Sequence, residues 1–208
     1  MHCIIQARMA SKRLPGKVLK NLVGELVLSR VIKQIKKAKK VSKIIIATSR
    51  NKIDLKIVNF CKRNNVKYFR GNHHNVAKRF VETLKKYPSN YFIRICADSP
   101  LIDPFLIDKM INISNKKKFD IVTNIFPRTF PKGHSIEILK SSILIRNYKN
   151  FTTHQNEHLT SFFYKNNKNF KIFNLKSKIN NSKKNYCLDK SSDILRLKKY
   201  IEKNKNNE

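Results

Sequence analysis

Four cationic side chains lie within a ten-residue segment near the start of the chain, directly after a short apolar run. They are Arg8, Lys12, Arg13 and Lys17. A triphosphate carries about four negative charges, and binding it requires several cations together with exposed backbone donors. Small residues in the same segment, among them Ser11 and Gly16, would let the backbone approach phosphate oxygens closely. The segment therefore predicts a phosphate-binding loop, although a solvated basic turn would have a similar composition.

Two aspartates that are distant in the sequence could hold a divalent cation. Asp98 lies just after the apolar run 91–96, and Asp189 lies between another expected strand and the last expected helix. Mg²⁺ usually takes only one or two protein carboxylates, together with phosphate oxygens and waters. Each aspartate could instead cap a turn or a helix through its carboxylate. Asp103 is expected to cap the helix that follows it.

Two other features could suggest a zinc site or a disulfide, but neither is expected. Residues 154–158 fit the H-x-x-E-H pattern of some zinc peptidases, yet so short a motif recurs by chance and the sequence offers no obvious third ligand. The four cysteines are scattered, without a Cys-x-x-Cys pair. This scatter favours free thiols in a reducing cytosol.

The first half of the chain alternates short apolar runs with amphipathic segments. Strands are expected at 2–7, 43–48, 66–69 and 91–96, and helices at 25–39, 53–64 and 76–86. In the second helix, we expect Leu55, Val58 and Phe60 to point inward. The alternation is typical of an α/β fold with a mostly parallel central sheet and flanking crossover helices. Ligands of such sheets usually bind at the carboxyl ends of the strands.

The second half of the chain is less regular. Helices are expected at 105–113, 157–164 and 191–202, and strands at 120–123, 135–139 and 170–175. The chain is long enough for one domain with one substantial core, so we expect a single domain over residues 1–203. The polar tail 204–208 is expected to fray. No apolar run is long enough to predict a membrane span, and no secretory signal is seen, so a cytoplasmic location is expected.

The charge of the chain is strongly positive, with 46 Lys and Arg against 13 Asp and Glu and a formal net charge of +33. Such a balance could indicate binding to nucleic acid or another polyanion. However, the lysines are spread along the chain and accompany many Asn and Ile residues, which all have A/T-rich codons. We therefore favour a compositional origin for the charge, which would in either case attract a phosphate-bearing ligand.

Several motifs, in order along the chain, resemble those of the cytidylyltransferase family. They are IIQARMASKRLPGKVLKNL at 4–22, IIIATS at 44–49, YFRG at 68–71, YFIRICADSPLIDP at 91–104, FPRTFPKGHSIEI at 126–138 and NEHLTSFFY at 156–164. The family includes the acylneuraminate and 3-deoxy-manno-octulosonate cytidylyltransferases, and the similarity is greatest to its SpsF-like branch of spore coat polysaccharide biosynthesis proteins. The resemblance implies a Rossmann-like nucleotide-diphospho-sugar transferase fold and an enzyme that uses CTP and Mg²⁺ to activate a sugar acid as a CMP-sugar. A homodimer is also possible by analogy with relatives.

The resemblance also implies roles for particular residues. Those expected to be catalytic are Lys17, Arg13 and Asp98, and those expected to bind the nucleotide are Ala7, Arg8, Ser11, Arg13 and Lys17. Asp98 and Asp189 match the family's metal-binding aspartates. On the acceptor side of the site, the matching residues are Glu137, Glu157 and His158.

One segment departs from the pattern of the SpsF-like branch. Residues 132–137 read Lys-Gly-His-Ser-Ile-Glu, where the branch usually has Asp-Gly-Leu-Asp-Val-Glu, so two carboxylates are replaced, by Lys132 and Ser135. This change predicts an altered acceptor pocket. It leaves open a sugar-1-phosphate nucleotidyltransferase or a glycosyltransferase-like protein of the same fold. A non-enzymatic basic nucleic-acid-binding protein is a further alternative, although the chain lacks the basic and aromatic platform of single-strand binders.

Overall fold

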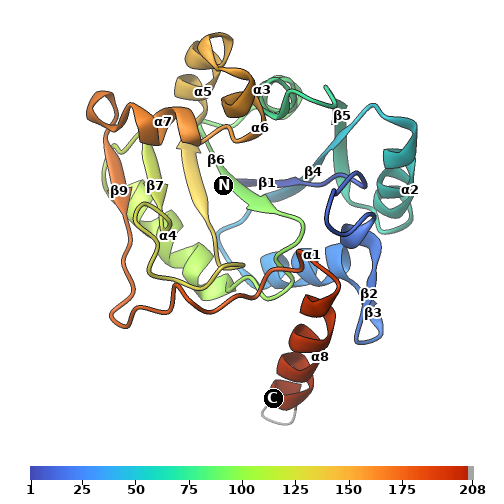
Figure 1. The fold of residues 1–208 in the computed structure, drawn as a ribbon. Helices are drawn as coiled ribbons and strands as arrows, with labels where there is room; N and C mark the ends of the chain where they lie inside the picture. The colour runs from blue at the N-terminus through green and yellow to red at the C-terminus, as the bar shows by residue number, and fades with distance from the viewer. Residues whose placement is uncertain (206–208) are drawn as a thin grey trace.

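A seven-stranded, mostly parallel sheet forms the centre of the computed structural model, which describes residues 1–205 (Figure 1). The strand order is β5 (Lys67–Gly71), β4 (Lys43–Ser49), β1 (His2–Gln6), β6 (Tyr91–Cys96), β8 (Glu137–Lys140), β7 (Ile121–Thr123) and β9 (Ile172–Asn174). The first four strands of this order run parallel, β8 is antiparallel to both of its neighbours, and β9 is parallel to β7. The sheet confirms the predicted α/β fold class.

Helices cover both faces of this sheet. They are α1 (Val27–Lys37), α2 (Leu55–Arg63), α3 (Val76–Lys86), α4 (Pro104–Lys116), α5 (Ser141–Asn147), α6 (Thr153–Glu157), α7 (Ser161–Lys165) and α8 (Ser192–Lys205). Short 3₁₀ helices occur at Lys17–Leu19, Lys52–Asp54, Tyr148–Asn150 and Asn167–Asn169. Among residues 1–205, no helix has both the length and the apolar character needed to cross a membrane.

Alternation of side chains along the central strands gives the sheet two apolar faces, as expected for strands buried on both sides. On one face, Ile5 and Ile46 pack with residues of α1, α2 and α4 in the largest core cluster. On the other, Ile4 and Ile45 pack with residues of α3, α5 and α7. The molecule therefore has three layers, and the carboxyl ends of β1 and β6 open at one edge.

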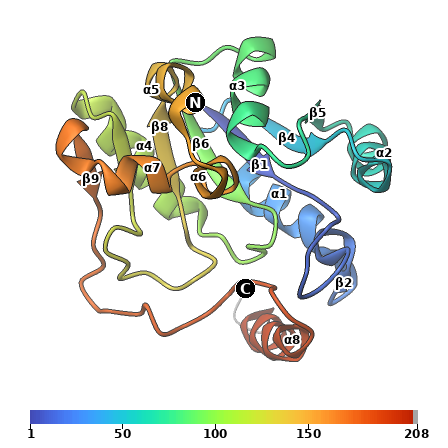
Figure 2. The same cartoon turned by 45° about the horizontal axis from the view of Figure 1, so that its top comes forward.

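The last helix packs away from the main sheet, against the region that follows β1. Figure 2 shows α8 beside the hairpin of β2 (Asn21–Leu22) and β3 (Glu25–Leu26). A third apolar cluster joins them, in which Leu14 and Leu22 pack with Leu188 and Leu197. This cluster connects the cationic segment directly with the chain around Asp189.

Three sequence predictions of secondary structure were wrong in detail. The helix expected from residue 25 begins at Val27, because Val23 and Gly24 both take positive φ angles, 54° and 73°, and turn the chain into a hairpin. The helix expected at 157–164 is two helices, α6 and α7, with Thr152 capping the first through its hydroxyl. Asp189 follows a segment without regular secondary structure rather than a strand.

Two smaller differences concern helix faces and ends. Leu55, expected to point inward, is 41% exposed, and the buried position on that turn of α2 is Ile57. Helix α8 continues to Lys205, so residues 204 and 205 of the expected tail are helical, and residues 206–208 lie outside the described chain.

Candidate active site

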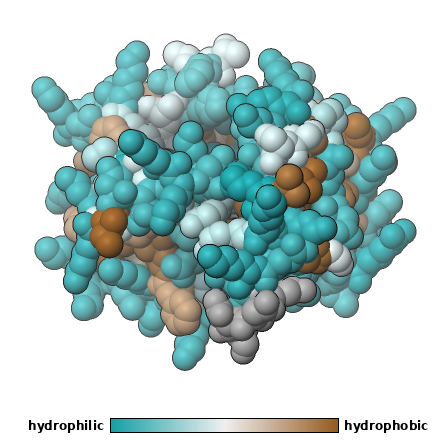
Figure 3. Space-filling model, turned by 60° about the horizontal axis from the view of Figure 1, so that its bottom comes forward, coloured by the Kyte–Doolittle hydropathy of each residue, from teal (hydrophilic) through white to brown (hydrophobic). Residues whose placement is uncertain are grey.

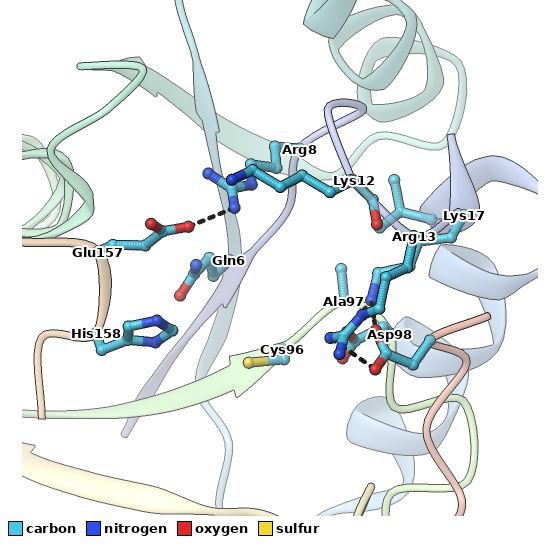
Figure 4. A pocket seen from close by; sticks show the side chains of 13 residues that line it. Gln6, Arg8, Lys12, Arg13, Lys17, Cys96, Ala97, Asp98, Glu157 and His158 are labelled. Carbon is cyan, nitrogen blue, oxygen red and sulfur yellow. Dashed lines mark hydrogen bonds and ion pairs between the residues drawn. The ribbon is translucent and has the colours of Figure 1, made fainter. Parts of the chain in front are cut away.

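A cavity of about 450 Å³ opens at the carboxyl ends of β1 and β6 (Figure 4). Three stretches of sequence supply its lining: the strand ends, the cationic segment after β1, and the second half of the chain. The lining residues are Gln6, Arg8, Ser11, Lys12, Arg13, Lys17, Val18, Cys96, Ala97, Asp98, Glu157, His158 and Asp189. Eight of the ten predicted site residues are among them; Ala7 and Glu137 are not.

The cationic segment is held in place by its few apolar residues. Met9 is buried, its backbone N–H donates to Asp54 at 2.7 Å, and its carbonyl accepts from the backbone N–H of Gly16 at 2.9 Å. Gly16 has a φ of 70°, and a Cβ atom there would lie 3.2 Å from the end of the Met9 side chain. The loop therefore folds back on itself, and its cationic side chains line the cavity.

Lys17 lies between the two aspartates that the sequence singled out. Its Nζ is 2.5 Å from Asp98 Oδ2 and 3.3 Å from Asp189 Oδ1, and Arg13 is 2.6 Å from the other oxygen of Asp189. Burial alone would lower the pKa of Lys17, but Asp98 and Asp189 raise it above its ordinary value. The ammonium is thus firmly protonated, and segments more than 80 residues apart in sequence meet at one point.

Asp98 and Asp189 are the residues that could hold a divalent cation such as Mg²⁺. Both offer hard oxygen donors to one small space, and Mg²⁺ needs only one or two such groups when phosphates and waters complete its shell. Among residues 1–205, no cluster of three His, Cys, Asp or Glu side chains could hold a metal.

Asp189 lies just before α8, in a turn that the carboxylate of Asp193 stabilises. The carboxylate of Asp193 accepts the backbone N–H groups of Asp189 at 2.8 Å and Lys190 at 2.9 Å, and also accepts from Arg196 at 2.7 Å. Both oxygens of Asp189 contact cations, Lys17 and Arg13, and among residues 1–205 its carboxylate has no hydrogen bond to a backbone N–H of α8. The carboxylate of Asp98 accepts a hydrogen bond from Lys17. Asp103 caps α4, as expected.

The opposite wall of the cavity carries Glu157 and His158. Arg8 reaches across from the cationic segment and donates to Glu157 at 2.6 Å, an ion pair visible in Figure 4. This hydrogen bond lowers the pKa of Glu157. The pKa of His158 is also lowered, first by burial and then by His154, so its ring is neutral at pH 7.

Two of the predicted site residues lie behind the lining. The backbone N–H of Ala7 is already committed to the carbonyl of Ala47, at 3.2 Å. Glu137 is 1% exposed and hydrogen-bonds to Arg94 and Tyr164 beneath the floor of the cavity. The side chain of Glu137 is therefore not positioned to reach a ligand in this structure.

Comparison with known proteins places the chain among nucleotide-transferring enzymes. A family model described as cytidylyltransferase matches residues 2–208. The uncharacterized protein MJ1063 of Methanocaldococcus jannaschii is 38% identical over 173 residues, which cover 83% of this chain and 70% of that protein. The spore coat polysaccharide biosynthesis protein SpsF of Bacillus subtilis is 32% identical over 146 residues, 68% of this chain and 60% of that protein.

A third relative is the 3-deoxy-manno-octulosonate cytidylyltransferase of Geobacter sulfurreducens, 31% identical over 52% of this chain but only 42% of its own length. Among solved structures, a cytidylyltransferase from Leptospira borgpetersenii superposes with a TM-score of 0.91 and 29% identity, covering 99% of this chain and 94% of that one. A CMP-2-keto-3-deoxy-manno-octonic acid synthetase in complex with CTP shares the fold, with a TM-score of 0.74 at 17% identity over 97% of this chain and 98% of that one. The chain belongs to the cytidylyltransferase family.

Proposed function

We propose that this protein transfers a cytidylyl group from CTP to a sugar acid, giving a CMP-sugar and pyrophosphate, in the synthesis of a surface polysaccharide. The observation that carries the proposal is the meeting of Lys17 and Arg13 with Asp98 and Asp189 in one cavity. Cations for a triphosphate and carboxylates for a divalent ion are the two requirements of nucleotidyl transfer. The named functions of SpsF and the octulosonate enzymes support the sugar-acid acceptor.

In the proposed reaction, an acceptor hydroxyl oxygen attacks the α-phosphorus of CTP in line, and the bond to the β-phosphate oxygen breaks as pyrophosphate leaves. Lys17 and Arg13 would neutralise the negative charge of the phosphates, and the raised pKa of Lys17 keeps its charge available. The neutral ring of His158 would accept the proton that the hydroxyl loses. Catalysis would then consist of positioning and charge neutralisation, without a covalent enzyme intermediate.

Asp98 and Asp189 are the residues that would hold Mg²⁺. When bound there, the ion would offset charge on the phosphates. Lys17 now donates to both carboxylates, so nucleotide binding would require it to exchange at least part of this contact for phosphate oxygens. The same ammonium would in this way keep the two carboxylates close together before the substrates arrive.

The altered segment at 132–137 does not line the cavity within the described chain. Ser135 accepts a hydrogen bond from Arg128 at 3.0 Å, and the backbone N–H of Lys132 donates to the carbonyl of Lys184, also at 3.0 Å. The replacement of two carboxylates by Lys132 and Ser135 therefore changes no side chain that lines the cavity. This placement supports retaining the sugar-acid proposal despite the departure from the family pattern.

The proposal is tested by measuring pyrophosphate release with CTP, Mg²⁺ and a panel of octulosonic and nonulosonic acids. Asp98→Asn should lower turnover by more than about tenfold, equivalent to about 1.4 kcal/mol of barrier. Asp108→Asn is a suitable control, because within the described part of the chain Asp108 accepts only the backbone N–H groups of Lys39 and Lys40, away from the cavity. Unchanged turnover in Asp98→Asn would refute the assigned site.

A thermal-shift screen with all four nucleoside triphosphates tests the choice of nucleotide. Stabilisation by CTP alone is the expected result, since a ligand raises the melting temperature only if it binds the folded state. Equal stabilisation by another triphosphate would favour a sugar-1-phosphate nucleotidyltransferase or a glycosyltransferase-like protein instead.

A further inference from the structure

A buried polar network lies beneath the floor of the cavity. Arg94 of β6 is flanked by Glu137 of β8, directly opposite it in the strand register, and by Gln6 at the end of β1. One guanidinium nitrogen donates to Glu137 Oε2, and Nη2 donates to Gln6 Oε1 at 3.2 Å. Burial alone would lower the pKa of Arg94, but its ionisable neighbours, Cys96 and Glu137, raise it. Arg94 is therefore a fixed cation under the cavity.

Tyr164 of α7 completes the network, from the helical layer that packs on the face of the sheet with Ile4 and Ile45. Its hydroxyl donates to Glu137 Oε1 at 2.5 Å and lies 2.9 Å from Thr123 Oγ1. The ring is held by Phe126, stacked on it with centroids 4.6 Å apart and planes 11° from parallel. Burial and the charge of Glu137 raise the pKa of Tyr164 well above its ordinary value, so the hydroxyl keeps its proton. Both oxygens of Glu137 are thus occupied.

The network decides how the amide of Gln6 is oriented. A guanidinium has only donors, so the atom of Gln6 that faces Arg94 must be the carbonyl oxygen Oε1. The amide nitrogen Nε2 must then point the other way, and the residue lines the cavity. Within residues 1–205, Nε2 makes no hydrogen bond to the protein. Figure 4 shows Gln6 between the Arg8–Glu157 pair and His158, across the cavity from Arg13 and Asp98.

We infer that Gln6 binds the acceptor, its amide N–H₂ group donating to a hydroxyl or carboxylate oxygen of the sugar acid. Arg94, Glu137 and Tyr164 are positioning residues, which hold the amide so that its donor and not its oxygen faces the substrate. This inference rests on the proposed function. It gives Glu137 an indirect role on the acceptor side, through Arg94 and Gln6, instead of direct contact with the substrate.

The first test compares steady-state kinetics of Gln6 variants, with CTP and Mg²⁺ and whichever of 3-deoxy-manno-octulosonate or N-acetylneuraminate the wild type turns over. Gln6→Met removes the amide but keeps the length of the side chain. It should raise the KM for the acceptor by about tenfold, the value of one hydrogen bond in a built site, while the KM for CTP changes less than about twofold. Gln6→Glu places an acceptor atom where a donor was, and should weaken acceptor binding further.

The second test asks whether the network acts through Gln6. Tyr164→Phe removes one hydroxyl and should raise the acceptor KM by about threefold. In the Gln6→Met background, the same change should have no further effect, because the amide it positions is gone. Tyr91→Phe is the matched control: its hydroxyl donates to the Phe119 carbonyl at 2.9 Å, at the other end of β6, and its loss should leave both KM values unchanged.

Three results would overturn the inference. One is a rise in the KM for CTP, in place of the acceptor, in Gln6→Met. Another is a Tyr164→Phe effect that persists in full when Gln6 has been replaced. The third is a wild-type chain that releases no pyrophosphate with any acceptor, which would overturn the proposed function as well. Melting curves of each variant distinguish a change in binding from a loss of folding. Because Gln6 lies at the surface of the cavity, we do not expect Gln6→Met to unfold the protein.

Discussion

Replacing Lys17 by methionine isolates the charge at the centre of the site, because the side chain keeps its length and loses only its ammonium. Lys17 is 13% exposed, while its partners Asp98 and Asp189 are 24% and 30% exposed. Removing one partner of a fully buried pair costs about 3–5 kcal/mol, and of an exposed pair about 1 kcal/mol or less. For this partly screened cluster, we expect Lys17→Met to lose about 1–2 kcal/mol of unfolding free energy, or roughly 3–6 °C in Tm.

The same variant should respond to Mg²⁺ in the opposite direction. In the wild type, the ion must displace or share the carboxylates that Lys17 now binds. In Lys17→Met the two carboxylates repel each other and no ammonium competes, so Mg²⁺ without nucleotide should bind more tightly and raise the Tm more than in the wild type. Turnover with CTP should nevertheless fall by more than about tenfold, because the triphosphate has lost a cation.

Thermal denaturation with and without MgCl₂, together with pyrophosphate release, measures all three effects. Lys56→Met, an exposed lysine of α2 outside the cavity, controls for the loss of a positive charge elsewhere. A Lys17→Met protein as stable as the wild type and indifferent to Mg²⁺ would show that the two carboxylates do not form a cation site. Undiminished turnover would show that Lys17 does not act on the triphosphate.

Three further predictions concern the supports of the site. Asp193→Ala should lower the free energy of unfolding by about 1–3 kcal/mol in a denaturant titration, since two backbone N–H groups lose their acceptor. Burial alone would raise the pKa of Asp193, but hydrogen bonds from Arg196 and the backbone lower it below its ordinary value of 3.8. The stabilisation by Asp193 is therefore present above pH 3.8 and is lost as the pH falls through the lower pKa of the folded state. Below that pH, the wild type and Asp193→Ala should have the same free energy of unfolding. Gly133→Ala should destabilise the chain by more than about 2 kcal/mol in thermal denaturation, because its φ is 96° and a Cβ atom would lie 2.6 Å from the backbone of Tyr186. Glu157→Gln should lower the KM for CTP in steady-state kinetics by freeing Arg8; a higher KM would argue that the ion pair helps to position Arg8.

The elements that could be predicted from sequence are those whose burial depends on local pattern. The runs at 43–48 and 91–96 are apolar because central parallel strands are buried on both faces, and helix α3 has the bounds expected from its spacing. The β2–β3 hairpin was missed because Glu25 and Leu26 continue the amphipathic pattern of α1. Gly24 was the one local signal of the turn, and its partner Val23 adopts a positive φ that its side chain disfavours.

The residues of the site, too, could be predicted from sequence only in part. Asp98, Lys17 and Arg13 could be predicted to meet because all follow strands whose carboxyl ends share one edge of the sheet. The network of Gln6, Arg94 and Tyr164 could not, since it depends on strand register and on helix α7. A signal was nonetheless present: Arg94 is the only charge within the apolar run 91–96, and a charge buried in a central strand requires a partner.

The net charge of the chain and the charge of the site differ in size. Four cationic and three anionic side chains line the cavity, so the site itself is close to neutral, whereas the whole chain carries +33. Hydrophilic residues cover most of the face shown in Figure 3, and the excess lysines must lie on such surfaces. Those lysines can increase the rate of encounter with an anion, but they cannot distinguish a triphosphate from another polyanion. Discrimination between a triphosphate and another polyanion requires cations and carboxylates held side by side. The fold brings these groups together around Lys17.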